Sequence, residues 1–154
     1  MLEQQIEALR TNNRINLLLF DATTDEGMAC TLSKRGGRDV LRQFAHIHDV
    51  RRMQIEKRGK QLGLQLERFP AKEPVTRARV RRALVTSGKA LEQFFTAIDA
   101  GEASCMKRGP ATYLAYFMAH EAHHRGSILL TLKTSGHAVP KDLRYGLWGE
   151  WDRR

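Results

Sequence analysis

The residues best suited to do chemistry in this chain are its histidines, which number six and fall in three places. They are His46 and His48, then His120, His123 and His124, then His137. His120 and His124 are four residues apart, so on a helix their rings share one face and can converge on one point. A helix offers two imidazoles to a metal ion in this way. A third imidazole from a neighbouring helix would complete a three-nitrogen site with an open coordination position.

The pattern around this pair also favours a metal. Apolar residues at helical spacing share one stripe with two polar residues, Glu121 and His124; the full stripe is Leu114, Phe117, Glu121, His124, Ile128 and Leu132. A carboxylate and an imidazole in such a stripe are costly unless they are paired or bound to metal. The alternatives are a polar network without metal, or a helix turned so that both side chains are exposed to solvent. The paired histidines and the second histidine cluster favour the metal.

The segment from His120 to His124 also matches HExxH, the zinc-peptidase motif. The extended form of that motif requires Gly where Ser127 stands and His where Leu130 stands. No strand pattern upstream would supply a sheet to hold a peptide, and the chain is short for such an enzyme. Peptidase activity therefore stays a minor alternative.

Four segments with helical periodicity must position these residues. They cover about residues 2–24, 38–62, 76–100 and 111–135, with glycine and proline residues between them. Strand patterns are almost absent. We therefore predict an all-α fold, a four-helix bundle, in a single domain over residues 1–154. The segment after Lys141 contains Tyr145 and both tryptophans, Trp148 and Trp151, and we expect it to dock on the bundle or on a partner.

Composition and charge set broad limits on function. With 154 residues, 42% hydrophobic and 28% charged, the chain has the composition of a soluble globular protein. No apolar run reaches the roughly 18 residues that a membrane helix needs. We see no secretion signal, and the two cysteines lack a paired spacing. These features predict a cytoplasmic protein that does not bind membranes.

The basic residues are unevenly distributed. The formal net charge is +9, and the segment from Arg51 to Arg82 contains eleven basic and three acidic residues. One interpretation is a solvated face formed by two helix ends and a loop. The other is a surface that binds anions or nucleic acid. No nucleic-acid recognition motif accompanies the charge, so nucleic acid is a possible partner that the sequence does not favour.

Two segments resemble a known family. Residues 119–126 read AHEAHHRG and resemble the AHExHHRG signature of the DinB/YfiT-like superfamily, and residues 40–47 resemble its upstream helix. The resemblance implies a four-helix bundle of about this length, a homodimer, and a three-histidine site for a divalent metal, commonly nickel or zinc. It assigns the ligands to His46, His120 and His124. Ser127 stands where the family usually has Gln, so any contact made by that amide would be altered.

The choice between His46 and His48 needs a separate argument. The two are about 200° apart on a helix, so only one can face the site well. The helical wheel places His48 nearer the centre of the apolar face formed by Val40, Phe44 and Ile47. The family spacing of apolar positions fits His46 instead. We choose His46 and keep His48 as the alternative.

The resemblance also suggests an activity. Its characterised members carry out thiol transfer or thiol-assisted isomerisation with low-molecular-weight bacterial thiols. A metal held by three neutral imidazoles keeps its charge and lowers the pKa of a bound water or thiol, so hydrolysis of a small substrate is a second option. In either case Glu121 is the first candidate for a general base or for orienting a ligand. The competing hypothesis is a non-enzymatic basic bundle that binds nucleic acid or holds a structural metal.

Overall fold

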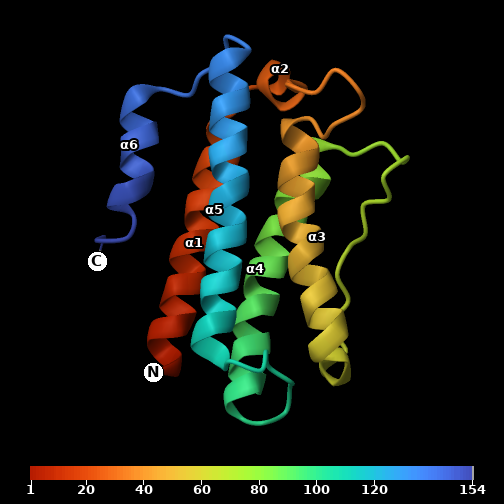
Figure 1. The fold of residues 1–154 in the computed structure, drawn as a ribbon, viewed down its shortest axis with the longest axis vertical. Coiled ribbons are helices and arrows are strands. Elements are labelled where there is room, and N and C mark those ends of the chain that lie inside the picture. The colour runs from red at the N-terminus through yellow and green to blue at the C-terminus, as the bar shows by residue number, and fades with distance from the viewer. Residues whose placement is uncertain (154) are drawn as a thin grey trace.

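The computed structural model describes residues 1–153, and within this range it contains helices but no strands (Figure 1). The long helices are α1 (Leu2–Ala22), α3 (Val40–Arg58), α4 (Arg77–Asp99) and α5 (Pro110–Thr134). The short ones are α2 (Asp25–Met28), a 3₁₀ helix (Lys60–Leu62) and α6 (Lys141–Gly149). The prediction of an all-α fold is confirmed, and the four expected segments agree with the long helices to within a few residues at each end.

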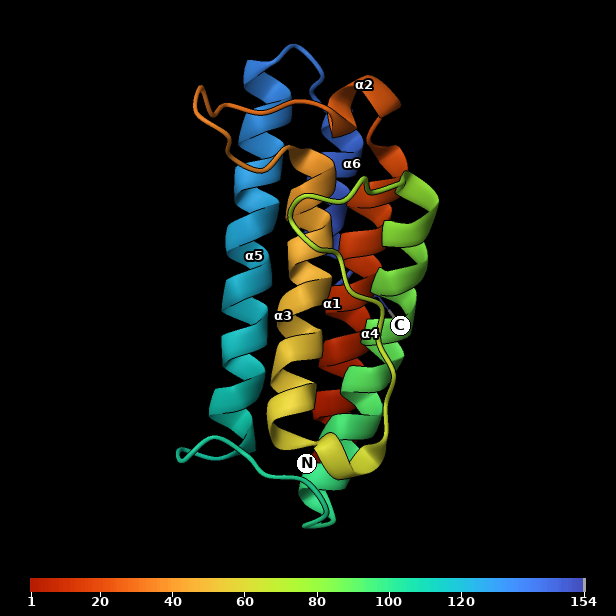
Figure 2. The same cartoon turned by 90° about the vertical axis from the view of Figure 1, so that its right-hand side faces the viewer.

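The long helices pack around a shared core. In ring order they are α1, α4, α3 and α5, and each contacts its two neighbours. Helices α1 and α5 run in one direction, while α3 and α4 run in the other (Figures 1 and 2). Since α3 and α4 are parallel, residues 63–76 cross back along the bundle between them, as Figure 2 shows. The antiparallel pair of α3 and α5 places the first turns of α3 beside the upper half of α5.

Local chemistry explains where the site helices begin and end. Helix α3 begins after Asp39, whose side chain accepts a hydrogen bond from the Arg42 backbone nitrogen at 2.7 Å. Helix α5 begins at Pro110, a residue that suits the first helical position because its missing N–H needs no partner there. It ends just before Gly136, whose φ of 81° lies in the left-handed region that favours glycine.

The core has two apolar clusters with polar residues between them. One cluster contains Phe20, Phe44 and Leu132, and the other contains Phe95 and Phe117. Buried polar side chains occupy the positions between the clusters along the helices: Asn12, Asn16, Arg51, Ser87 and Glu121. The interior is therefore divided by a polar layer near the middle of the bundle.

The C-terminal segment docks on the bundle through α6. This helix lies along α1 on the side away from α3 (Figure 1). Leu147 is buried, and Glu150 accepts a hydrogen bond from the Arg14 side chain at 2.6 Å. Tyr145 and Trp148 remain exposed. Within residues 1–153, no helix has the length and hydropathy needed to cross a membrane.

Candidate metal centre

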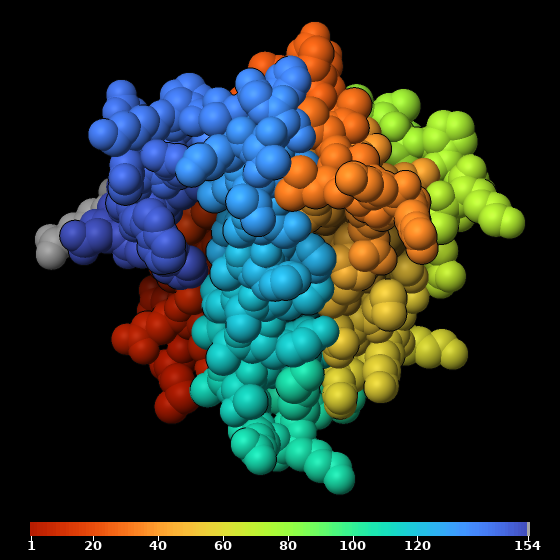
Figure 3. Space-filling model, turned by 45° about the horizontal axis from the view of Figure 1, so that its top comes forward, coloured from red at the N-terminus to blue at the C-terminus, as the bar shows by residue number. Residues whose placement is uncertain are grey.

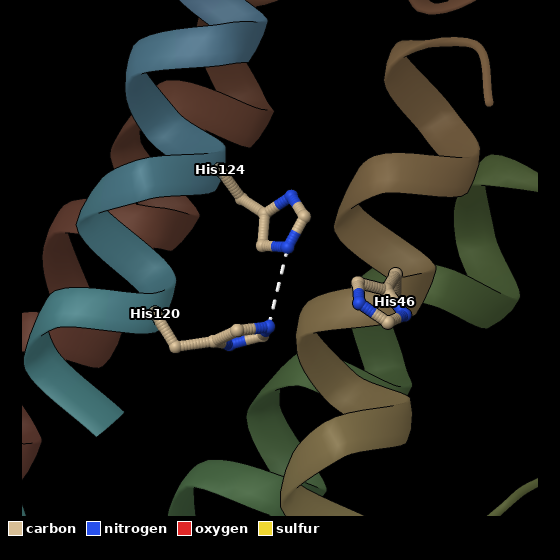
Figure 4. Close-up of side chains that lie close together, drawn as sticks. All are labelled: His46, His120 and His124. Carbon is tan, nitrogen blue, oxygen red and sulfur yellow. Dashed lines mark hydrogen bonds between the residues drawn. The ribbon is translucent and has the colours of Figure 1, made fainter. Parts of the chain in front are cut away.

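The structure brings together the three histidines that the sequence singled out. His46 projects from α3, and His120 and His124 project from α5 toward it (Figure 4). One potential ligand atom from each of the three lies within 4.8 Å of the others. The Nε2 atoms of His120 and His124 are 3.2 Å apart, and the His46 and His124 ring centroids are 4.9 Å apart. The cluster could hold a metal ion.

The geometry fits a divalent ion. A tetrahedral zinc with nitrogens at about 2.0–2.1 Å holds them about 3.3 Å from one another. The 3.2 Å between the Nε2 atoms of His120 and His124 is close to this spacing. The Nδ1 atom of His120 is buried without a hydrogen-bond partner in the described part of the chain. One ring nitrogen of the cluster thus makes no hydrogen bond to the described part of the protein. Imidazoles accept zinc, nickel, copper and iron, so the ligand type does not identify the metal.

The protonation state of the cluster suits metal binding. Burial is the largest cause that lowers the pKa of each of the three histidines, and the pKa of His124 falls to about 4. The neighbouring rings of His120 and His46 add to the effect on His124, because like charges would repel. All three rings are therefore neutral at pH 7. A metal ligand must be neutral imidazole, so no proton has to be displaced at that pH.

Glu121 faces a different environment from its neighbour His120. Its side chain is fully buried, and the Arg51 guanidinium donates to both carboxylate oxygens at 2.6 Å. Asn12 and Asn16 donate to Oε2 at 2.5 and 2.6 Å. Burial alone would raise the pKa of Glu121, but Arg51 and Asn16 outweigh it, and the pKa lies below its usual value. None of the three histidines is a hydrogen-bond partner, so the structure does not bring Glu121 into the cluster.

Sequence reasoning missed Arg51, which we had counted only as part of the basic stretch. The residue is buried in the middle of the bundle, where it also donates to the Asn13 side chain at 2.8 Å. A signal for this burial was present: Ile47, Arg51 and Ile55 follow one another at intervals of four, so Arg51 lies in an apolar row of α3.

The remaining histidines lie outside the cluster. His48 is buried, with Nδ1 3.0 Å from the Ala83 carbonyl oxygen and Nε2 2.7 Å from the Glu67 carbonyl oxygen. Both ring nitrogens therefore face backbone carbonyls rather than the other rings. His123 is exposed beside His124, with ring centroids 5.1 Å apart. His137 is exposed beyond the end of α5. Of the pair weighed from the sequence, His46 is the one that joins the cluster.

Two cavities lie beside the cluster. The larger, of about 470 Å³, is lined by His46, Asp49 and Phe69, among others. The smaller, of about 290 Å³, is lined by His124 and by Ser127, the residue that departs from the family signature. Residues from the segment between α2 and α3 line both cavities. Figure 3 shows this segment in orange beside α5 in blue. All three histidines are half-buried; His46 and His124 line these cavities, whereas His120 lines neither.

Ion pairs account for much of the basic stretch from residue 51 to residue 82. Six of its eleven basic side chains form such pairs: Arg51 with Glu121, Arg52 with Asp49 and Glu56, Arg68 with Glu56, Arg77 with Asp25, Arg79 with Glu67, and Arg81 with Asp21. The pairs of Arg52 lie within α3, and the others connect helices to one another or to the crossing segment. More than half of the basic side chains of the stretch therefore have an acidic partner within the fold.

Comparison with known proteins gave one match. The sequence model of the DinB family matches residues 2–152, which is nearly the whole chain. No curated protein and no solved structure matches the chain.

Proposed function

The chain belongs to the DinB family, and from this premise we propose that it is a metal-dependent enzyme whose ion is held by His46, His120 and His124. The observation that carries the proposal is the convergence of three half-buried imidazoles with lowered pKa values beside two cavities. A structural site closes all four positions of the ion with protein ligands, whereas three ligands leave one position for a substrate. Nickel or zinc is the expected ion.

Two reaction types suit such a centre. A divalent ion held by neutral ligands acts as a Lewis acid and lowers the pKa of a water or thiol that binds it. We propose transfer of a low-molecular-weight thiol to an electrophile as the reaction, with hydrolysis of a small substrate as the second option. The protein's part is to hold the ligands neutral, to leave the cavities on both sides of them open, and to keep α3 and α5 in register.

Glu121 serves this centre as a positioning residue in our proposal. Its carboxylate is occupied by the Arg51, Asn12 and Asn16 side chains, so it is not free to accept a proton from a substrate. The same bonds join α5 to α1 and α3. They fix the helix that carries His120 and His124 relative to the helix that carries His46. Of the two roles expected from the sequence, the geometry favours orientation over general-base catalysis.

Metal content tests the proposal directly. Protein purified without a histidine tag is supplied with zinc or nickel, freed of excess ion and analysed by mass spectrometry. We expect about one ion per chain in the wild type and in the control His137→Ala, whose histidine is exposed and outside the cluster. His124→Ala should lose the ion while its circular dichroism stays helical. A wild type that binds neither metal would overturn the proposal. Light scattering of the same samples tests the expected homodimer.

A further inference from the structure

Arg38 lies between the two cavities at the candidate metal centre. It is the one charged residue that lines both cavities, the larger together with His46 and the smaller together with His124. After burial, the positive charge of Arg38 is among the causes that lower the pKa of both histidines, as expected for a cation near their rings. Its side chain is exposed at the opening of the site.

The guanidinium of Arg38 is not used by the fold. Within residues 1–153 it forms no ion pair and no hydrogen bond; only the backbone carbonyl is engaged, accepting from Thr31 Oγ1 at 3.3 Å. The other arginine of the larger cavity, Arg42, donates to the carbonyl oxygens of Pro70 and Glu73 and so ties the crossing segment to α3. Arg38 is therefore the cation of this cavity that remains available.

The carboxylates of the larger cavity do not neutralise Arg38. Asp39 accepts from the Arg42 backbone nitrogen at 2.7 Å and caps α3. Asp49 lies 3.4 Å from the Arg52 guanidinium. The smaller cavity has no carboxylate among its lining residues. An anion that enters from this side would meet Arg38 without displacing an existing partner.

The backbone on both sides of Arg38 is held in place. Ser33 Oγ accepts from the Gly37 backbone nitrogen at 2.8 Å, which closes the turn that contains Gly36. On the other side, the Val40 backbone nitrogen donates to the Cys30 carbonyl oxygen at 3.0 Å. The start of the Arg38 side chain is thus fixed beside the histidines before any ligand binds. Such preorganisation lowers the entropic cost of binding.

We infer that Arg38 binds the acidic group of a small organic substrate, a carboxylate or a phosphate, whose reacting end reaches the three histidines. The fork of the guanidinium matches the two oxygens of either group. The net charge of +9 favours the approach of anions from solution. This inference rests on the proposed metal-dependent function, and it narrows the substrate to anionic molecules.

Anion binding to the protein without metal tests this inference independently of metal binding. Backbone amide NMR shifts are followed during titration with succinate, with inorganic phosphate, and with succinamide as a neutral analogue of succinate. We expect succinate or phosphate to shift the Gly36 and Gly37 signals, and succinamide to leave them unchanged. Arg38→Gln should weaken the binding about tenfold or more, since it removes a charged hydrogen-bonding partner. Arg35→Gln is the matched control, because Arg35 lies in the same loop and lines neither cavity.

The outcomes separate the two proposals. A preference for succinate or for phosphate identifies the acidic group. Equal anion affinity in Arg38→Gln and the wild type, or no anion binding by the wild type, would overturn the role of Arg38 even if the metal binds. Failure to bind metal, with anion binding that depends on Arg38, would overturn the metal-dependent function alone. In cobalt-loaded protein, a change in the visible spectrum on adding the anion, diminished in Arg38→Gln, would connect the two sites.

Discussion

His120 and Glu121 are neighbours in α5, yet their polar atoms have very different surroundings. Both Glu121 oxygens are occupied by donors from Arg51, Asn12 and Asn16, and the carboxylate is inaccessible to solvent. His120 is half-buried, and its Nδ1 atom has no partner among residues 1–153. One turn of helix thus contributes a carboxylate whose two oxygens are both bonded and an imidazole with one unbonded nitrogen; in the network around Glu121, the Asn12 Oδ1 atom also has no partner among residues 1–153.

This difference in hydrogen bonding separates a residue that holds the helices together, Glu121, from residues that could bind a ligand, the three histidines. A buried charge persists only when all its hydrogen bonds are made, and the resulting network holds the helices in one arrangement. Neutral imidazoles near the surface can remain incompletely bonded at a smaller cost. The Glu121 network therefore fixes α1, α3 and α5 relative to one another. The histidine cluster is built on two of these helices, and its Nε2 atoms from His120 and His124 contact each other at 3.2 Å rather than a partner elsewhere in the fold.

The largest effect is expected when the network around Glu121 is broken. In Glu121→Ala the Arg51 guanidinium stays buried without its counter-charge, and both asparagines lose an acceptor. Removal of one partner of a buried pair costs about 3–5 kcal/mol. Urea unfolding of the metal-free protein measures this loss. His120→Ala, one residue away, should change the free energy of unfolding far less, and comparable losses in the two variants would contradict the distinction.

The next largest effect is the loss of metal binding by the histidine cluster. Zinc or nickel at a hundred times its dissociation constant should stabilise the wild type by about 2.7 kcal/mol, because the ion binds the folded chain. His46→Ala should lose this stabilisation while the metal-free variant unfolds much like the wild type, since the ring is only half-buried. Thermal unfolding with and without the ion provides the measurement. An unchanged gain in His46→Ala would remove His46 from the ligand set.

His48 should respond in the opposite way. Its ring nitrogens lie near the carbonyl oxygens of Ala83 in α4 and Glu67 in the crossing segment, and a neutral ring donates to one of the two, so His48→Ala removes that bond and the buried ring. Loss of such a bond costs about 1–3 kcal/mol. The folded fraction of the variant should still bind about one ion per chain. Loss of the ion from well-folded His48→Ala would restore His48 as the alternative ligand.

The sequence predicted the parts of this molecule that depend on local periodicity. The long helices follow from their apolar spacing, and the interval of four between His120 and His124 placed both rings on one face. The ion-ligand assignment of His46 came from the resemblance, while the helical wheel pointed to His48. The sequence therefore predicted which residues share a face of a helix better than it predicted which neighbouring helix each face contacts.

The surroundings of α3 explain this limit. The helix contacts α4 on one side and α5 on the other, and the crossing segment adds Phe69, whose ring centroid lies 5.4 Å from that of His48. Most faces of α3 are consequently covered, and polar residues such as Arg51 and His48 are buried in environments supplied by distant segments. A wheel describes one helix alone and contains no information on what covers each face.

The smallest expected effect is a pH dependence of the metal-free protein. The pKa of His124 is near 4 in the fold, against 6.5 for an ordinary histidine. Between these values the unfolded chain binds a proton that the folded chain does not, so the free energy of unfolding falls as the pH falls through this window. Because the ring is half exposed and solvent screens it, we expect a loss of about 1 kcal/mol or less between pH 7 and pH 5. Glu121, whose pKa is lowered, loses its contribution only at more acidic pH.

Urea unfolding at both pH values should show a smaller loss in His124→Asn than in the wild type. Equal losses in the two proteins would mean that His124 takes up a proton as readily in the folded chain as in the unfolded chain. The metal-free protein would then not hold the ring of His124 in the neutral form that metal binding requires.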